Sequence, residues 1–162
     1  MGCSIGSLFV FPITTDRILL VAHLMISVFA IGAVTHHWWL LRRGAKAPAD
    51  KLAKYARWMA ISYPLALLAG VLIYPSYNVL IRKPPLGVLE NTLPWAVGLF
   101  EIKEHLGTIA LAMLPWLVIS ARRYPTLGRI ERASYVAATW IFTLFVYYVF
   151  IAGAVVTMIK SY

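Results

Sequence analysis

The chain has 162 residues, of which 61% are hydrophobic and 13% charged, and its formal net charge is +9. An average soluble domain carries about 25% charged residues, so this composition excludes an ordinary soluble domain and predicts a protein solvated by lipid. The basic residues form short clusters between long apolar runs, a pattern typical of membrane topology and not of nucleic-acid binding. The single cysteine, Cys3, excludes an internal disulfide and a cysteine metal cluster.

Four apolar runs are each long enough to cross a bilayer, which takes about 20 residues at about 1.5 Å per residue. In chain order they cover residues 18–41, 58–81, 104–121 and 135–159. Pro64 and Pro75 each remove a backbone hydrogen bond, so the second run is expected to be kinked. The sequence therefore predicts an all-α fold, an integral membrane four-helix bundle that forms a single transmembrane domain over residues 1–162.

The longest connector between these runs covers residues 82–103. It contains Pro84, Pro85 and Pro94, which break it too often for a further span. Its mostly apolar stretch also holds Trp95 and Phe100. We therefore expect this connector to lie on the membrane interface as a short helix or lid.

The charges of the connectors predict the orientation of the bundle. Ten basic residues fall in the first and third connectors: Arg42, Arg43, Lys46, Lys51, Lys54, Arg57, Arg122, Arg123, Arg129 and Arg132. The opposite side has five: Arg17, Arg82, Lys83, Lys103 and Lys160. Because basic connectors stay in the cytoplasm, both termini and the 82–103 connector are predicted on the non-cytoplasmic side of a multi-pass protein of the cell's inner (cytoplasmic) membrane.

Two histidines are the main candidates for a functional site, because ionisable side chains within a span are costly in lipid. His23 lies near the outer end of the first span and His105 at the outer start of the third, so they are expected at similar depth. Imidazoles at one depth on neighbouring helices can ligate the iron of a haem. A b-type haem is expected because the chain has no CxxCH attachment motif. Four basic residues at that end are expected to pair with the haem propionates: Arg17, Arg82, Lys83 and Lys103.

A second pair of histidines, His36 and His37, allows two interpretations. His37 follows His23 by fourteen positions, which places it about 40° off the same helix face and roughly 21 Å further along. This spacing resembles the two-haem helices of the cytochrome b family, and a second metal site at His37 would need an unusual partner such as Met59 or a residue of another subunit. Alternatively, both histidines lie at the inner interface, in an aromatic belt formed by Trp38 and Trp39 with Arg42 and Arg43.

The segment ILLVAHLMISVFAIGAVTHHWWLLRR, the proline-containing second span and the segment EIKEHLGTIALAMLPWLVISARR carry a family resemblance. Together they resemble the four-helix membrane families of the HemJ-type protoporphyrinogen oxidases and of the copper-resistance CopD type. In those families a histidine near the outer start of the first span and another at the start of the third are typical, and His23 and His105 match these positions. The order of Lys103 before His105 departs from the HemJ pattern.

These features predict a b-type cytochrome subunit that carries electrons through a bis-histidine haem between the quinone pool and a partner complex of the respiratory chain. Quinone is therefore a second expected cofactor, with Glu101, Lys103 and Glu104 as candidates for proton relay. The expected partners are the lipid bilayer and other membrane subunits, with no nucleic acid. An electron-transfer subunit is favoured over a stand-alone enzyme. The alternatives are a HemJ-like protoporphyrinogen oxidase and a haem-free accessory subunit of a respiratory or photosynthetic complex.

Overall fold

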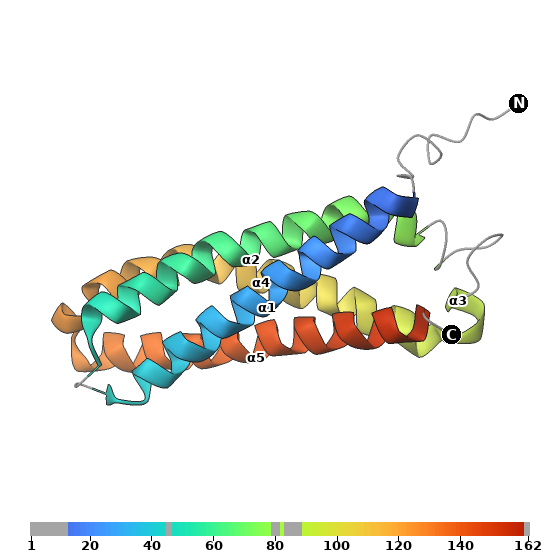
Figure 1. Cartoon of the computed structure of the whole chain (residues 1–162). Coiled ribbons are helices and arrows are strands. Elements are labelled where there is room, and N and C mark those ends of the chain that lie inside the picture. Colours follow the sequence, from blue (N-terminus) through green and yellow to red (C-terminus); the bar gives the residue numbers. More distant parts are fainter. Residues whose placement is uncertain (1–12, 45–46, 79–81, 83–88, 161–162) are drawn as a thin grey trace, which may run out of the picture.

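The described part of the protein consists mainly of four long α-helices (Figure 1). The structure is a computed structural model that describes residues 13–44, 47–78, 82 and 89–160. In chain order the elements are α1 (Ile13–Leu41), α2 (Ala49–Tyr77), α3 (Leu89–Thr92), α4 (Pro94–Arg123), the 3-10 turn η4 (Tyr124–Thr126) and α5 (Arg129–Lys160). The described residues include no β-strand, so the predicted all-α class is confirmed.

Four of these helices are long and apolar enough to cross a membrane. They cover Arg17–Leu41, Ala49–Tyr77, Pro94–Thr126 and Arg129–Met158. The predicted number of spans therefore agrees with the number of such helices among the described residues. Pro64 and Pro75 both lie within α2, which runs through them as one helix.

All four long helices begin before the apolar runs that predicted them. Helix α2 begins at Ala49, well before the predicted start at residue 58, and its first turns carry Asp50, Lys51 and Lys54. Helix α4 begins at Pro94 and so includes the second half of the expected 82–103 connector. For α2 the reason is that hydropathy marks only the segment suited to hydrocarbon, whereas a helix continues into the polar headgroup region. For α4 the expected interfacial connector is wrong over residues 94–103, which belong to a helix apolar enough to cross a membrane. Proline is compatible with the first turn of α4, where its missing N–H has no helical partner.

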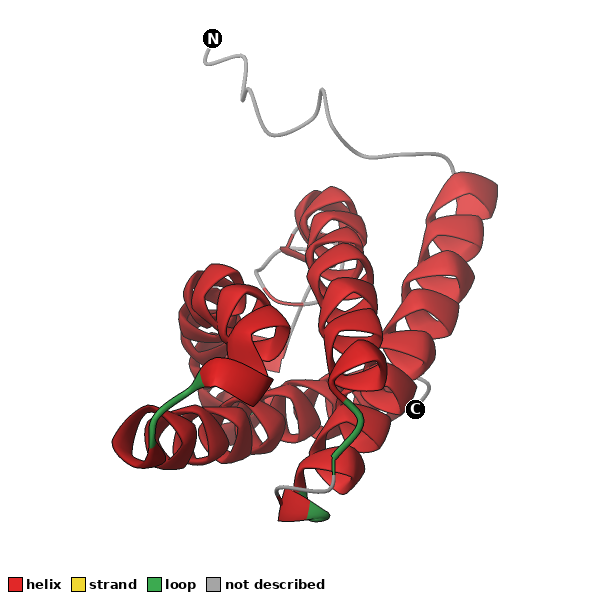
Figure 2. Ribbon diagram, turned by 90° about the vertical axis from the view of Figure 1, so that its left-hand side faces the viewer, coloured by secondary structure: helices red, strands yellow, loops and turns green. Residues whose placement is uncertain are grey.

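The arrangement of the helices gives the bundle two distinct ends. Helix α1 packs mainly on α2, and α4 packs on both α2 and α5. At one end, which we call the terminal end, α1 begins and α5 finishes, and α3 lies beside them (Figure 1). At the other, the loop end, residues 42–48 join α1 to α2 and η4 joins α4 to α5. Helix α1 crosses the bundle obliquely, leaning away from α5 toward the terminal end (Figures 1 and 2).

The core is built largely from small side chains. Lipid tails are as apolar as leucine, so helices in a membrane associate through close packing and interhelical hydrogen bonds. Small residues permit that close approach, and the buried set includes Ala30, Ala33, Ala56, Ala66, Ala69, Ala110, Ala121 and Ala152. Many large apolar side chains point outward, among them Ile18, Val21, Met25, Val71, Leu144, Ile151 and Met158. This inside-out distribution is compatible with a lipid environment.

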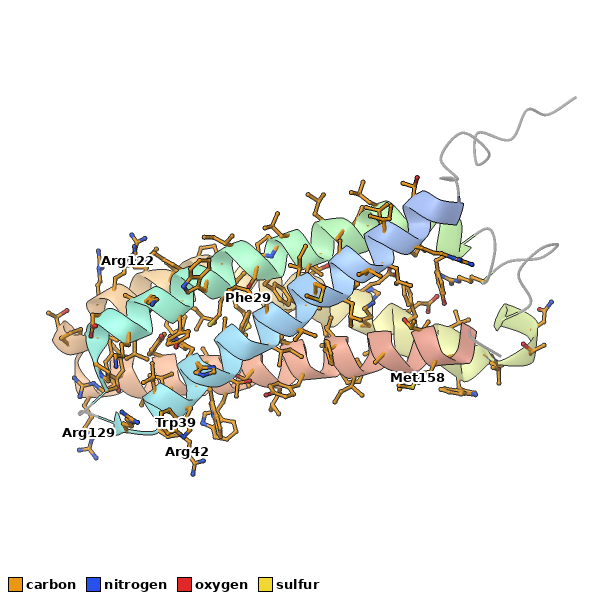
Figure 3. The ribbon with its side chains drawn as sticks, in the orientation of Figure 1. Phe29, Trp39, Arg42, Arg122, Arg129 and Met158 are labelled. Atoms are coloured by element: carbon orange, nitrogen blue, oxygen red, sulfur yellow. The ribbon has the colours of Figure 1, made fainter. Side chains whose placement is uncertain are left out.

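Aromatic and basic side chains gather at the loop end. Figure 3 shows Trp39, Arg42, Arg122 and Arg129 there, with Met158 at the opposite end. The guanidinium of Arg43 lies 4.2 Å from the ring centroid of Trp39, and that of Arg42 lies 5.1 Å from the ring of Trp38. These contacts confirm the expected association of the tryptophans with the arginines, which is the usual composition of a membrane–water boundary.

Candidate functional site

The two candidate haem ligands lie at similar depth in the bundle. His23 is about three turns into α1 and His105 about three turns into α4, and both helices start at the terminal end. The two histidines therefore lie at similar heights along the bundle, as expected. What the structure adds is the direction in which each imidazole faces.

His23 packs against α2. Its Nδ1 lies 2.8 Å from the carbonyl oxygen of Ala66. A carbonyl can only accept, so Nδ1 carries the proton in this contact, and in the neutral ring Nε2 keeps the lone pair. The ring also rests on Gly70, where an added methyl group would lie 3.4 Å from Cε1 of His23. Small residues on α2 thus create the space that this imidazole occupies.

His105 is exposed on the outer surface of α4, and its Nδ1 lies 2.8 Å from the carbonyl oxygen of Glu101, one turn earlier. Two residues turn a helix by about 200°, so His105 is nearly opposite Lys103 and Gly107. Both of these face the interior, where Gly107 is buried beside Leu67 and Tyr63 of α2. Within one chain the structure therefore does not bring His23 and His105 together.

Lys103 lies in the interior at the terminal end. A methyl group added at Gly153 of α5 would be 3.3 Å from its Nζ, and Nζ itself is 4.9 Å from the ring centroid of Phe100. The ammonium is also close enough to His23 for the two groups to interact electrostatically. Among the predicted propionate partners that the structure describes, Lys103 is the one that shares the interior with His23.

Arg82 is engaged in a different cluster, which we call the terminal cluster: Tyr74, Tyr77, Arg82, Phe100 and Glu101. The Nη2 of Arg82 lies 2.6 Å from Oε1 of Glu101, and its Nη1 donates to the Tyr74 hydroxyl at 3.4 Å. The rings of Tyr77 and Phe100 stack with their centroids 4.6 Å apart, and Tyr74 stacks on Phe100 at 5.9 Å. Of the other two predicted propionate partners, Arg17 is exposed and Lys83 lies outside the described residues.

The terminal cluster was not predicted from the sequence. Its only local signal is the spacing of Tyr74 and Tyr77, which puts both rings on one helix face. Their contact with Phe100 joins α2 to α4 across more than twenty residues, and no local pattern encodes it.

The two remaining histidines have different surroundings. His36 is exposed and stacks on Tyr55, with ring centroids 5.3 Å apart. His37 is fully buried, and its Nε2 lies 2.6 Å from the hydroxyl oxygen of Tyr135 on α5. Its Nδ1 is directed toward the backbone of Leu52 without a hydrogen bond of standard geometry. His37 is thus a buried member of the core, whereas the aromatic belt of the alternative interpretation involves its neighbours Trp38 and Trp39.

Among the described residues, no three histidine, cysteine or carboxylate side chains form a group that could hold a bare metal ion. A haem iron differs from such an ion because the porphyrin supplies four of its ligands and the protein supplies one or two. Comparisons of the chain with protein-family models, curated proteins and solved structures found no match in any of the three.

Proposed function

We propose that this protein is a membrane-embedded b-type cytochrome subunit that carries electrons between the quinone pool and a partner complex. The observation that carries the proposal is the hydrogen bond from Nδ1 of His23 to the Ala66 carbonyl. Histidines that ligate metals usually donate their other ring proton to a backbone carbonyl or a carboxylate, which fixes the tautomer and makes the ligating nitrogen more basic. His23 has this arrangement with Nε2 left for iron.

The surroundings of His23 also suit a haem. Ala66 and Gly70 let the imidazole pack closely on the facing helix, and Lys103 supplies a positive charge in the same interior. No carboxylate of the described residues is within ion-pair distance of Lys103, whereas Arg82 is already paired with Glu101. Lys103 is therefore our first choice for pairing with a haem propionate. When bound, the haem would supply a one-electron carrier at the terminal end.

His105 is the second axial ligand of this proposal. Like His23, it donates its Nδ1 proton to a backbone carbonyl and keeps Nε2 for a metal. Because His105 faces the exterior of α4, a bis-histidine haem requires either a turn of the terminal half of α4 or the approach of His105 from a neighbouring chain. We therefore test the contribution of each histidine to haem binding in a separate variant.

The test is a dithionite-reduced minus oxidised spectrum of the purified full chain and of three histidine variants. We expect the chain to show the α band of a b-type haem and His23→Ala to lose it. His36→Ala is the matched control for His105→Ala, because both side chains are exposed and bond the carbonyl one turn earlier. Loss of one of two axial ligands should shift His105→Ala from low-spin to high-spin bands and leave His36→Ala unchanged.

Two outcomes would contradict the proposal. If no α band appears in the unmodified chain reconstituted with haem, the cytochrome function fails and the haem-free accessory subunit takes its place. If the band survives unchanged in His23→Ala, the protein binds haem elsewhere and the assignment of this ligand fails.

A further inference from the structure

A groove lies on the outer surface of α2 near the loop end. It has a volume of about 290 Å³ and is lined by Lys54, Arg57, Trp58 and Ile61. These positions are spaced i, i+3, i+4 and i+7, so they share one face of the helix. The basic pair comes first along the chain, and the two large apolar side chains follow, so the groove is basic toward the loop end and apolar toward the middle of the bundle.

The change from basic to apolar side chains along the groove matches the boundary between lipid headgroups and hydrocarbon. The apolar run of the second span begins at residue 58, which places Trp58 at the edge of the hydrocarbon and the two cations just outside it. Trp58 is held in position by Phe29 of α1, whose ring meets it edge to face with centroids 5.4 Å apart. Figure 3 labels Phe29, midway along α1. The wall of the groove is therefore supported by two helices.

The two cations of the groove, Lys54 and Arg57, form no ion pair within the part of the chain that the structure describes. Of the acidic residues at this end, Asp50 lies one turn before Lys54 on α2 but forms no ion pair with it, and Glu131 accepts a hydrogen bond from the Gly128 backbone. Lys54 and Arg57 thus present two positive charges directly above an apolar surface.

We propose that this groove binds the headgroup of an anionic phospholipid. The phosphate would pair with Lys54 and Arg57, and the start of an acyl chain would lie along Trp58 and Ile61. Basic pockets beside membrane-spanning helices recognise anionic lipids in this way, and arginine matches the phosphate oxygens in a bidentate manner. The proposal uses no residue of the haem site and does not depend on it.

The test uses the full chain in vesicles of phosphatidylcholine that contain increasing amounts of brominated phosphatidylglycerol or, for comparison, brominated phosphatidylcholine. Bromine quenches tryptophan emission on contact, and the signal of Trp58 is the difference between the chain and its Trp58→Phe variant, because the chain has six tryptophans. We expect phosphatidylglycerol to quench Trp58 preferentially. Each basic residue near an anionic surface contributes about 1 kcal/mol, so Lys54→Gln or Arg57→Gln should reduce the preference about fivefold.

Matched variants decide what the groove recognises. Lys51→Gln removes a charge from the same helix outside the groove and should keep the preference, as should the double variant Lys54→Arg with Arg57→Lys. Equal quenching by the two lipids, or a preference that survives Lys54→Gln with Arg57→Gln, would overturn the proposal. Displacement of the lipid by millimolar inorganic phosphate would also overturn it, because the site would then recognise phosphate alone.

Discussion

The Nε2 atom of His37 and the hydroxyl oxygen of Tyr135 lie 2.6 Å apart, and both side chains are fully buried between α1 and α5. Their rings are nearly perpendicular, at 89°. The two residues are 98 positions apart in the chain, so this hydrogen bond joins the first span to the last at the loop end. A second hydrogen bond, between the hydroxyl groups of Thr35 and Tyr147 at 2.6 Å, also joins α1 to α5, but it is only partly buried.

Tyr135→Phe should destabilise the bundle, because it leaves a buried imidazole nitrogen without a partner. Interhelical hydrogen bonds in membranes average about 0.6 kcal/mol, while an unsatisfied buried polar group costs about 1–3 kcal/mol. We expect a loss of about 1 kcal/mol in the free energy of unfolding, measured by denaturation in mixed micelles. Tyr148→Phe, on the same helix and only partly buried, is the control. Equal stability of the two variants would show that the contact is energetically neutral.

Gly107 should not tolerate a large side chain. It is buried in α4, where an added methyl group would lie 3.4 Å from Cδ2 of Leu67 on α2. Gly107→Leu would force these helices apart at a cost of about 1–3 kcal/mol. Gly98→Leu on the same helix is the control, because a methyl group added at Gly98 meets nothing within 4 Å. The thermal midpoints of the two variants in detergent provide the measurement. A midpoint for Gly107→Leu as high as that for Gly98→Leu would contradict the packing described here.

The ion pair between Arg82 and Glu101 should hold the end of α2 to α4. Arg82 is 13% exposed but Glu101 is 50% exposed, so solvent screening limits the pair to about 0.5–1 kcal/mol. We expect Arg82→Gln to increase hydrogen exchange in the last two turns of α2. The exchanged pair, Arg82→Glu with Glu101→Arg, should recover part of the protection. Unchanged exchange in Arg82→Gln would mean that the aromatic stack alone maintains this contact.

The predicted orientation can be tested with single cysteines in a Cys3→Ser background. Asn91 in α3 and Thr126 in η4 are both exposed, one at each end of the bundle. If the loop end is cytoplasmic, Asn91→Cys should react with an impermeant maleimide on intact cells, and Thr126→Cys only after the membrane is permeabilised. The reverse pattern would place the termini in the cytoplasm and contradict the positive-inside prediction.

The span count could be predicted from the sequence because it depends on a local property. A run of about 20 apolar residues is costly in water and favourable in lipid regardless of what it packs against. The ends of the helices could not be predicted as well as their number. Hydropathy does not detect the polar turns Ala49–Arg57 of α2, although their backbone is helical. The association of Arg42 and Arg43 with neighbouring tryptophans was also predictable, since it joins residues one helical turn apart.

The depth of His23 and His105 follows from their sequence positions, but the direction of each imidazole does not. Depth depends on the rise per residue, which is the same in every helix, whereas direction depends on which face of α4 packs against α2 and α5. That choice is made by close packing around Gly107 and Leu114, which turns Lys103 inward and His105 outward. The packing of α1 against α5 likewise decides that His37 is buried against Tyr135. The sequence by itself thus determined four lipid-soluble helices and their polar residues, and the packing of small side chains between helices decided which of those residues meet.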